Sequence, residues 1–251
     1  MGKLTKPLVR WLVLVAAAML VLQLFFVVRI AFMVIIDPQS TTFQRSEVWR
    51  IANEKGRLPW RQQWADYAQI SEHLKRAVIA SEDDSFNDHD GVDWNALEKA
   101  WEKNAKAQAR ADRLGNSTSA RAQPTVRAPK VVGGSTITQQ LAKNLFLSGE
   151  RTLLRKGQEL ALTLMLETFL SKRRILEIYL NNVEWGSGVF GAEAAAQHYF
   201  RKSASRLSSF EAARLAVMLP RPKYFEKLPN SAYLAARASV IAGRLENAVL
   251  P

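Results

Sequence analysis

The sequence contains no cysteine among its 251 residues, so disulfide bonds and thiolate chemistry are excluded in any compartment. Outside its N-terminal apolar run, the chain also lacks a convincing alternation of apolar and polar residues of the kind that predicts strands. Hydrophobic residues nevertheless make up 48% of the chain, which is enough for a core. These features predict a mainly α-helical fold.

A long apolar run occupies the N-terminus: residues 11–28 are interrupted only by Gln23, and apolar residues resume after Arg29 as far as Ile36. A helix of roughly 20 apolar residues crosses a bilayer, and the apolar region of a cleaved signal peptide is shorter. Lysine and arginine precede the run, so the positive-inside rule places the N-terminus in the cytoplasm. We expect residues 1–36 to be a retained single-pass anchor in the inner membrane, with the rest of the chain periplasmic.

Three segments are expected after the anchor. Residues 37–70 are predicted to be a juxtamembrane segment, 71–230 the helical domain that carries the chemistry, and 231–251 a helical tail. Within the domain, residues 104–130 consist mainly of small, basic and turn-forming residues. This composition predicts a mobile basic insertion that packs little.

Acidic residues are the scarcer charge: the chain has 23 of them against 35 lysines and arginines, a net charge of +12. The anchor contains four of the basic residues and no acid, so the remainder has 31 basic against 23 acidic residues, a net +8. A basic domain tethered to a membrane suggests an anionic partner, which is phospholipid head groups, a lipid-linked phosphate or nucleic acid. A charge excess that only keeps the domain soluble is the alternative, and charge alone does not choose between them. The anchor argues against nucleic acid.

Residues 81–91 read SEDDSFNDHDG and gather five acids in this basic protein. Glu82 directly follows the apolar run AVIAS, so its helix is expected to deliver this carboxylate to the edge of a core. Desolvation there raises the pKa of a carboxyl, which suits a general base or acid. A solvated acidic turn remains an alternative. A metal site at Glu82, Asp84, Asp88 and His89 is disfavoured, because the spacing matches neither a calcium loop nor HExxH.

Residues 133–144 read GGSTITQQLAKN, in which two glycines allow close approach of a ligand. Ser135 or Thr136 is predicted to cap a helix whose free N–H groups favour anions. A capped helix with a solvated basic face is the simpler alternative. The side chains that together can hold a pyrophosphate are Ser135, Thr136, Thr138, Gln139, Gln140, Lys143, Arg151 and Arg155.

The downstream sequence has helical spacing over 151–183, where Glu159 follows Arg155 by four residues, within salt-bridge reach. The simplest interpretation of Glu159 is that pair alone, and that of the SKRR stretch at 171–174 is a solvated helix end. Three glycines in 184–191 predict a loop. A capping box at 208–211 predicts a further helix, which Pro220 ends.

Four stretches taken in order resemble the motifs of a known family. SEDDSFNDHDGVDW, GGSTITQQLAKN, RKGQELALTLMLE and SKRRILEIYLNNVEWGSGVFGAEAAAQHYF are similar to those of the peptidoglycan glycosyltransferases. These enzymes are the polymerase modules of class A penicillin-binding proteins and the monofunctional biosynthetic transglycosylases. The resemblance covers roughly residues 70–225. Because the sequence has no SxxK or KTG, the monofunctional enzymes are the closer match.

The resemblance implies a lysozyme-like helical fold and lipid II as the substrate, polymerised with inversion into β-1,4-linked glycan with release of undecaprenyl diphosphate. It makes Glu82 the base for the acceptor hydroxyl and places Lys143 and Arg151 at the donor pyrophosphate. Glu159 matches a second carboxylate near the phosphates, where the family admits Mg²⁺ or Mn²⁺ without a firm requirement. Asp83, Gln139 and Gln140 match secondary positions. The implied partners are the growing glycan chain, membrane lipid, and cell-division or penicillin-binding proteins.

Two other functions are weighed against this one. A membrane-anchored lytic transglycosylase or lysozyme-like hydrolase also needs one catalytic glutamate, but it has no use for a pyrophosphate cradle. A catalytically silent scaffold for cell-wall assembly is a third possibility. The intact set of Glu82, Glu159, Lys143 and Arg151 argues against it.

Overall fold

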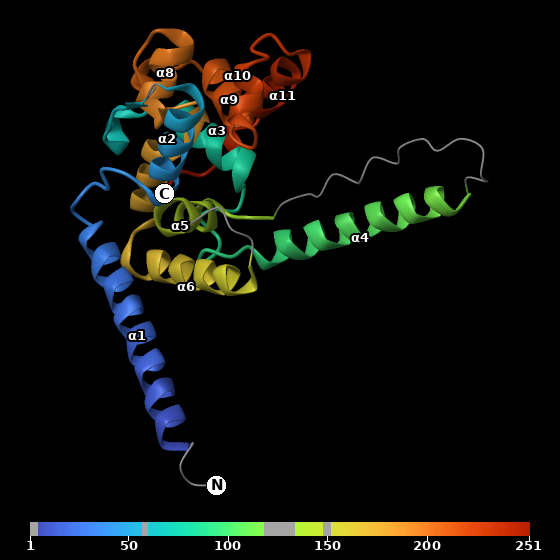
Figure 1. Cartoon of the computed structure of the whole chain (residues 1–251). Helices are drawn as coiled ribbons and strands as arrows, with labels where there is room; N and C mark the ends of the chain where they lie inside the picture. The colour runs from blue at the N-terminus through green and yellow to red at the C-terminus, as the bar shows by residue number, and fades with distance from the viewer. Residues whose placement is uncertain (1–4, 57–59, 118–133, 148–151) are drawn as a thin grey trace.

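The computed structural model describes residues 5–56, 60–117, 134–147 and 152–251 (Figure 1). Over these ranges the protein is mainly helical, as predicted, with one very small sheet. The α-helices are α1 (Thr5–Phe32), α2 (Thr42–Lys55), α3 (Glu72–Glu82), α4 (Trp94–Ser117), α5 (Ile137–Phe146), α6 (Leu153–Phe169), α7 (Lys172–Asn182), α8 (Ala192–Phe200), α9 (Ser209–Met218), α10 (Pro222–Glu226) and α11 (Ala232–Ala242). The short elements are η1 (Tyr67–Gln69), η2 (Ala204–Arg206), η3 (Leu245–Asn247), β1 (Arg61–Gln62), β2 (Glu184–Gly186) and β3 (Val189–Phe190).

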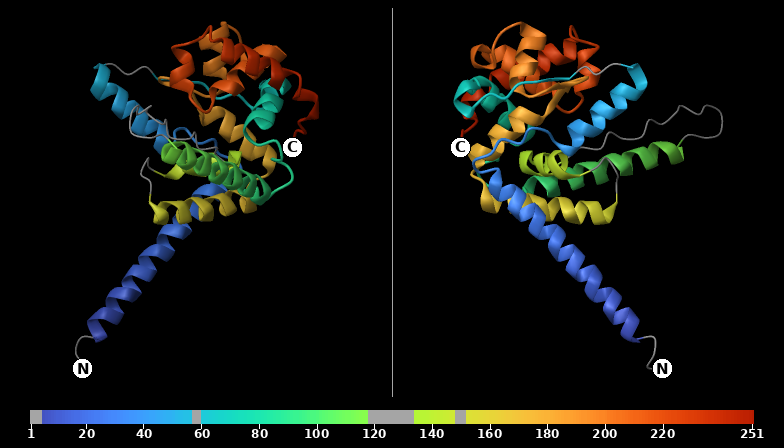
Figure 2. Two further views of the ribbon diagram at one scale, coloured as in Figure 1. Left: turned by 90° about the vertical axis from the view of Figure 1, so that its right-hand side faces the viewer. Right: turned by 60° about the vertical axis from the view of Figure 1, so that its left-hand side comes forward.

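The predicted apolar helix is present as α1. Its residues Lys6–Phe32 include an 18-residue window with a mean hydropathy of 2.7, and they are long and apolar enough to cross a membrane. Figures 1 and 2 show α1 extending away from the body of the molecule, with its N-terminal end farthest away. Towards its other end, the Arg29 guanidinium lies 5.3 Å from the centre of the Phe146 ring on α5. Gln23 exchanges hydrogen bonds with Gln158 on α6.

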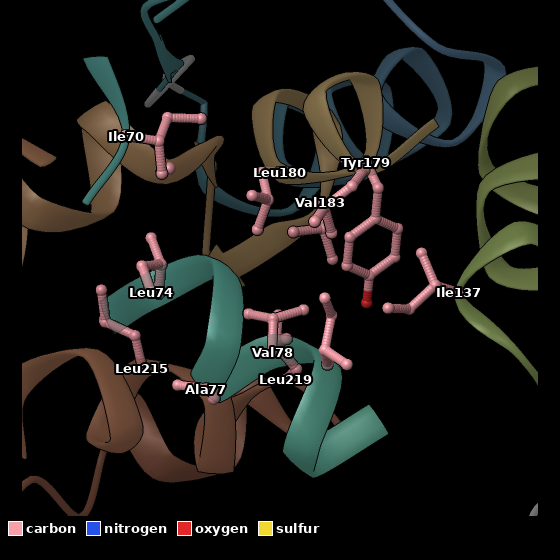
Figure 3. Packing of buried hydrophobic residues seen from close by; sticks show 14 of the residues in the cluster. Ile70, Leu74, Ala77, Val78, Ile137, Tyr179, Leu180, Val183, Leu215 and Leu219 are labelled. Atoms are coloured by element: carbon pink, nitrogen blue, oxygen red, sulfur yellow. The ribbon is translucent and has the colours of Figure 1, made fainter. Parts of the chain in front are cut away.

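Helix α3 lies at the centre of the hydrophobic core. Residues 77–80 are all buried, and the helix packs against α9 and α11. Figure 3 shows Leu74 of α3 beside Leu215 of α9, while Tyr179 of α7 faces Ile137 of α5. Burying each large aliphatic side chain stabilises the fold by roughly 1.5–3 kcal/mol. The C-terminal end of α3, where Glu82 lies, is therefore held firmly by its neighbours.

Helix α4 extends farther than composition alone predicts. It begins after Asp93 and continues to Ser117, so it includes the first part of the predicted insertion at 104–130. Alanine, lysine, glutamine and arginine are strong helix formers, which accounts for the extension. In Figure 1 α4 projects from the body of the molecule. Residues 118–133 lie outside the described ranges, so the mobility of the insertion stays a prediction.

The predicted loop at 184–191 is instead the centre of the small sheet. Strand β3 pairs in parallel with β1 and antiparallel with β2, in the order β1-β3-β2. Strands of two or three residues are too short to show an alternating pattern, which is why the sequence does not predict them. Trp185 of β2 is fully buried, and its Nε1 donates to the Leu215 carbonyl oxygen at 3.0 Å. The sheet is thereby fixed to α9.

The helical spacing over 151–183 corresponds to two helices rather than one. Helix α6 ends before Leu170, and α7 begins after Ser171. The Ser171 hydroxyl accepts a hydrogen bond from the Arg174 backbone N–H at 3.2 Å. An N-cap of this kind satisfies a free donor of a new helix, so the chain changes direction there.

The prediction that 171–174 is a solvated helix end is wrong for two of its cations. Lys172 Nζ lies 2.8 Å from a carboxylate oxygen of Glu167, and its side chain is only 19% exposed. Arg174 pairs with Asp37 at 2.7 Å and donates to the Met33 carbonyl oxygen. Arg174 therefore ties the start of α7 to the segment that directly follows α1.

The C-terminal segment 231–251 contains α11 and η3. Leu234, Ala238 and Ile241 of α11 are buried in the same core as α3 and α9. The predicted division of the chain at residue 230 stays a prediction.

Candidate functional site

Glu82 is the last residue of α3 and is half-buried where the buried stretch of this helix ends. Burial raises the pKa of its carboxyl. A hydrogen bond from Gln140 opposes this effect, the charge of Asp83 adds to it, and the charge of Lys143 opposes it, so that the pKa is raised overall. A carboxylate in this setting accepts a proton more readily than one in water.

Gln140 fixes the orientation of the Glu82 carboxylate. Its Nε2 donates to Glu82 Oε2 at 2.9 Å, and its Oε1 accepts from the Tyr179 hydroxyl at 3.0 Å. Tyr179 is buried, and burial together with the charges of Glu82 and Asp83 raises its pKa well above the ordinary value. Its hydroxyl therefore remains a donor, and it holds the amide of Gln140 with the N–H groups towards Glu82.

Asp83 connects the acidic stretch to the start of α5. One of its carboxylate oxygens accepts from the Ile137 backbone N–H, and the other contacts His89 Nε2, both at 2.9 Å. The Ile137 N–H lies in the first turn of a helix and has no partner within that helix. Burial opposes charging of His89, but the hydrogen bond and the charge of Asp83 raise its pKa overall. Asp83 therefore holds two parts of the site together.

Thr136 is the residue that caps α5. Its hydroxyl accepts from the Gln139 backbone N–H at 3.1 Å and donates to the Gly91 carbonyl oxygen at 2.7 Å. Gln139 Oε1 accepts in return from the Thr136 N–H at 3.2 Å, which completes a capping box. Ser135 is exposed and lines the cavity beside Glu82. A role in substrate binding for these three side chains stays a prediction.

Lys143 follows Gln140 by three residues, on the same side of α5. Desolvation lowers the pKa of its ammonium. The charge of Glu159 raises this pKa, the charges of Arg155 and Lys156 lower it, and the charge of Glu82 raises it. Lys143 is thus within electrostatic reach of the Glu82 carboxylate and of the charged cluster on α6.

The cluster on α6 surrounds the buried carboxylate of Glu159, which is 5% exposed. Arg155 Nη1 donates to Glu159 Oε2 at 3.1 Å, and Lys156 pairs with the other oxygen. The predicted Arg155–Glu159 pair is confirmed. Arg155 Nε is buried and has no hydrogen-bond partner in the part of the chain that the structure describes. Arg151, the other predicted cation, lies outside the described residues.

A cavity of about 320 Å³ lies beside Glu82 and Ser135. It is also lined by Lys99 and Lys103 of α4 and by Arg244, three cations that sequence reasoning missed. The two lysines are four residues apart and share a helix face, a signal that can be recognised in the sequence. Arg244 follows the acidic stretch by more than 150 residues, and no local pattern indicates its position.

This cavity continues into a second one of about 870 Å³ between α4 and α6. Both are lined by Asp84, Asp93 and Lys99, and the second also reaches Leu160 and Leu164 of α6. Leu160 and Leu164 are exposed. The two cavities adjoin at these shared residues and are called the catalytic groove below; Glu82 lines one of them, and Leu160 and Leu164 line the other.

The acidic stretch does not form a metal cage. Within the described ranges, no group of three or more histidine, aspartate or glutamate side chains is arranged to hold a metal ion. His89 is held by Asp83, Asp84 pairs with Arg244 at 3.0 Å, and Asp88 is exposed. Glu159, the carboxylate expected near the phosphates, has both oxygens engaged by cations.

Comparison with known proteins finds relatives that align with nearly the whole chain. The transglycosylase family model matches residues 51–246. The chain is 52% identical over 246 residues to a biosynthetic peptidoglycan transglycosylase of Burkholderia thailandensis, covering 96% of this chain and 88% of the relative. Proteins of the same name from Herminiimonas arsenicoxydans and Janthinobacterium sp. (strain Marseille) are 49% and 48% identical, covering 99% of this chain and 100% of each relative.

Glu82 and the cations of α5 and α6 lie within the matched range, as does the core that positions them. The family model covers well over half of the chain, and relatives of about 50% identity align with almost all of it. The chain therefore belongs to the transglycosylase family and is a glycosyltransferase.

Proposed function

We propose that the protein is a peptidoglycan glycosyltransferase that polymerises lipid II into β-1,4-linked glycan strands, with inversion and release of undecaprenyl diphosphate. The observation that carries this proposal is the position of Glu82. Its partly desolvated carboxylate, oriented by Gln140, lies within electrostatic reach of a cation that borders a second charged cluster. A base beside a cation cradle suits glycosyl transfer from a diphosphate.

Glu82 acts as the general base. The 4-hydroxyl of the acceptor sugar attacks the anomeric carbon of the growing chain, and the hydroxyl proton passes to the Glu82 carboxylate. The new bond joins the anomeric carbon to the acceptor oxygen, and the bond to the diphosphate oxygen breaks. This single displacement inverts the anomeric configuration, as in inverting glycosidases, with a sugar hydroxyl in place of water. The raised pKa of Glu82 supports this role.

Lys143 and Arg155 stabilise the leaving diphosphate, on which negative charge develops. A positioned cation in a partly desolvated site is most effective where that charge appears. Arg155 uses one Nη to hold Glu159, while its buried Nε remains a donor for a phosphate oxygen. Glu159 keeps Arg155 and Lys156 close together, where their charges would otherwise repel. Arg151 is proposed to join this set on the strength of the sequence motif alone.

The acceptor also carries a diphosphate, and a second set of cations lines the cavity on the α4 side of Glu82. Lys99, Lys103 and Arg244 are suited to receive it. Glu82 would then lie between two anionic substrates, each with its own cations. This arrangement places the acceptor hydroxyl at the base and the donor diphosphate at Lys143.

A protein-held Mg²⁺ or Mn²⁺ does not fit the described residues, because both oxygens of Glu159 already face cations. No step of the proposed mechanism depends on a metal. Any divalent ion would have to draw its ligands mainly from the diphosphate oxygens themselves.

The membrane position follows from α1 and from the nature of the substrate. Both polyprenyl tails stay in the bilayer, so the site must lie close to its surface. The catalytic groove is also lined by Leu160 and Leu164, which are exposed on α6, and α6 in turn contacts α1 through Gln158. We place the anchor in the inner membrane with its N-terminus in the cytoplasm and residues 71–230 in the periplasm. Cell-division and penicillin-binding proteins are proposed partners.

The lytic alternative is tested by the same assay. Purified full-length protein is expected to convert labelled lipid II into glycan that lysozyme digests. Glu82→Gln should lower the rate by about 10²–10⁴-fold, the usual contribution of a general base, while lipid II binding is retained. Glu72→Gln removes a carboxylate from the exposed start of the same helix and serves as the matched control. A Glu82→Gln enzyme with a near-native rate would refute the mechanism. Release of soluble fragments from finished peptidoglycan without lipid II consumption would establish the lytic function instead.

A further inference from the structure

A second cationic cavity lies near the opposite end of α3 from Glu82. Its volume is about 660 Å³, within the range of small-molecule sites. Tyr67 forms one wall, Lys75 and His73 come from the first turns of α3, Arg173 comes from α7 and Arg206 from η2. We call it the Tyr67 pocket. Lys75 precedes Glu82 by seven residues, about 10 Å along a helix, so the pocket is separate from the catalytic groove.

The Tyr67 ring is flanked by two cations. Lys75 Nζ lies 4.1 Å from the ring centre, and the Arg173 guanidinium carbon lies 4.7 Å from it. Lys75 is 5% exposed, and its ammonium donates to the Tyr67 carbonyl oxygen at 3.1 Å. Burial lowers the pKa of Lys75, and the charges of Arg173 and Arg76 lower it further, against the opposing effect of Glu72. Two cations on one ring repel each other, and the ring only partly compensates.

The acids near the pocket are already engaged. Glu177 accepts from the Tyr67 backbone N–H at 2.7 Å with one oxygen and from Arg174 with the other. Glu72 is mostly exposed and lies 3.9 Å from Arg76. Within the described ranges, neither Lys75, Arg173 nor Arg206 forms an ion pair with a carboxylate. The cations that line the pocket therefore outnumber its carboxylates, and this charge favours the binding of an anion.

Tyr67 supplies a further unused donor. It is 8% exposed, and its hydroxyl has no hydrogen-bond partner among the residues that the structure describes. Burial raises the pKa of this hydroxyl, so it keeps its proton. A buried donor without a partner costs about 1–3 kcal/mol unless a ligand or water satisfies it. The exposed guanidinium groups of Arg173 and Arg206 lie at the same cavity and can reach a ligand that enters from solvent.

The pocket lies close to the level at which the membrane helix ends. Arg174, the neighbour of Arg173, donates to the Met33 carbonyl oxygen and pairs with Asp37. These residues directly follow α1, and Asp37 is the first charged residue after the apolar run. Figure 2 shows the last part of α1 next to the start of α7. If α1 crosses the bilayer, the head-group phosphates of the bilayer are expected near this end of the helix.

We propose that the Tyr67 pocket binds a phosphate group, which the head group of an anionic phospholipid supplies at the membrane surface or free phosphate supplies from solution. Arg173 and Arg206 contact the phosphate oxygens, Lys75 neutralises the remaining charge, and the Tyr67 hydroxyl donates. The site would fix the height and orientation of the domain on the bilayer. It goes beyond the proposed catalytic function and does not depend on it.

The test uses the full-length protein in neutral detergent. Native mass spectrometry measures how much phosphatidylglycerol is retained relative to phosphatidylcholine, and equilibrium dialysis measures the binding of inorganic phosphate. The double variant Arg173→Gln/Arg206→Gln is expected to bind phosphatidylglycerol or inorganic phosphate at least about tenfold more weakly, since two charge-assisted contacts are lost. Both residues are exposed, so the variant should fold. Lys75→Met gives a second, independent loss within the pocket.

Two control variants separate this site from other cations. Arg237→Gln removes an exposed arginine from α11 and should retain native binding. Arg110→Gln removes an exposed arginine from α4 and should also retain native binding. If the native protein retains phosphatidylglycerol and the double variant does not, the bound phosphate group comes from a lipid head group. Binding of inorganic phosphate alone, lost in the same variant, identifies a soluble source. Native binding by the double variant, or an equal loss in Arg237→Gln, would overturn the proposal.

Discussion

The hydrogen bond from Gln140 to Glu82 sets the pH at which the base is ready to act. It lowers the pKa of Glu82 and so opposes the effect of burial. A hydrogen bond to a charged group contributes about 1.5–3 kcal/mol, and one pKa unit corresponds to about 1.4 kcal/mol. Gln140→Leu is therefore expected to raise the pKa of Glu82, and the lost free energy corresponds to about a ten- to a hundredfold change in the deprotonated fraction at low pH.

The assay is the initial rate of lipid II polymerisation as a function of pH. The rate requires the deprotonated base, so it rises with pH through the pKa of Glu82. In Gln140→Leu the acid limb should move to higher pH. At a pH below both pKa values the rate falls by about ten- to a hundredfold, and above both it approaches the native rate. A uniform loss of rate with an unmoved acid limb would refute this reasoning and assign Gln140 to substrate binding alone.

Two further variants separate the pKa effect from a loss of stability. Gln140→Leu also leaves the buried Tyr179 hydroxyl without its acceptor, which costs about 1–3 kcal/mol. Gln140→Leu/Tyr179→Phe removes both partners, so it should recover stability while the shifted acid limb persists. Gln139→Leu is the matched control, because the amide of Gln139 caps Thr136 instead of contacting Glu82. Its acid limb should stay at the native pH.

Three other predictions concern stability. Gln23 exchanges hydrogen bonds with Gln158, and such pairs in membranes contribute about 0.6–2 kcal/mol. Gln23→Leu should therefore lower thermal stability in detergent. Native stability of the variant would show that the pair contributes nothing. Glu184 has a pKa of about 7, above its ordinary value of 4.5 because of burial, so its contribution to stability is full below pH 4.5 and is lost as the pH rises through 7. Glu184→Gln should remove this fall in the unfolding free energy with rising pH, and above pH 7 it should be more stable than the native protein by up to about 3 kcal/mol. An unfolding free energy that falls with pH in parallel with that of the native protein would contradict this. Gly91 has a φ of +84°, and an added Cβ would lie 2.6 Å from Thr163 Cγ2. Gly91→Ala should therefore lower the unfolding free energy by at least about 1 kcal/mol. An unchanged denaturation midpoint would show that the protein tolerates both the backbone strain and the close contact.

Patterns that depend on neighbours in sequence are the ones that sequence reasoning recovers well. Thr136 and Gln139 form a capping box, and Arg155 reaches Glu159 one helical turn away, as their spacing predicts. The apolar run fixes α1 by composition alone. Each of these features involves residues within four positions or one continuous run, so helix geometry determines it.

Other features depend on chain segments that meet only in the folded protein. Asp83 accepts from the Ile137 N–H across 54 residues, and Arg244 reaches Asp84 across 160. The strands at 184–191 are too short for a pattern and form because β1 pairs with β3. Lys172 lies in a basic stretch that is typical of a solvated helix end. In the folded protein its ammonium instead pairs with Glu167 and donates to the His89 carbonyl oxygen, so it holds the acidic stretch in place.

The sequence by itself determined the apolar helix α1, which is long enough to cross a membrane, the helical class, and the identity of Glu82 as the carboxylate at the end of a buried helix. Those properties follow from composition and local spacing, which are fixed before the chain folds. Only the tertiary structure decided how basic Glu82 is, because its desolvation and its hydrogen bond with Gln140 depend on how α3 and α5 pack. It also decided where the excess positive charge lies, since the cations of the groove and of the Tyr67 pocket come from distant helices. A local sequence pattern does not show which distant residues will become neighbours, because the packing of the helices on a shared core decides it.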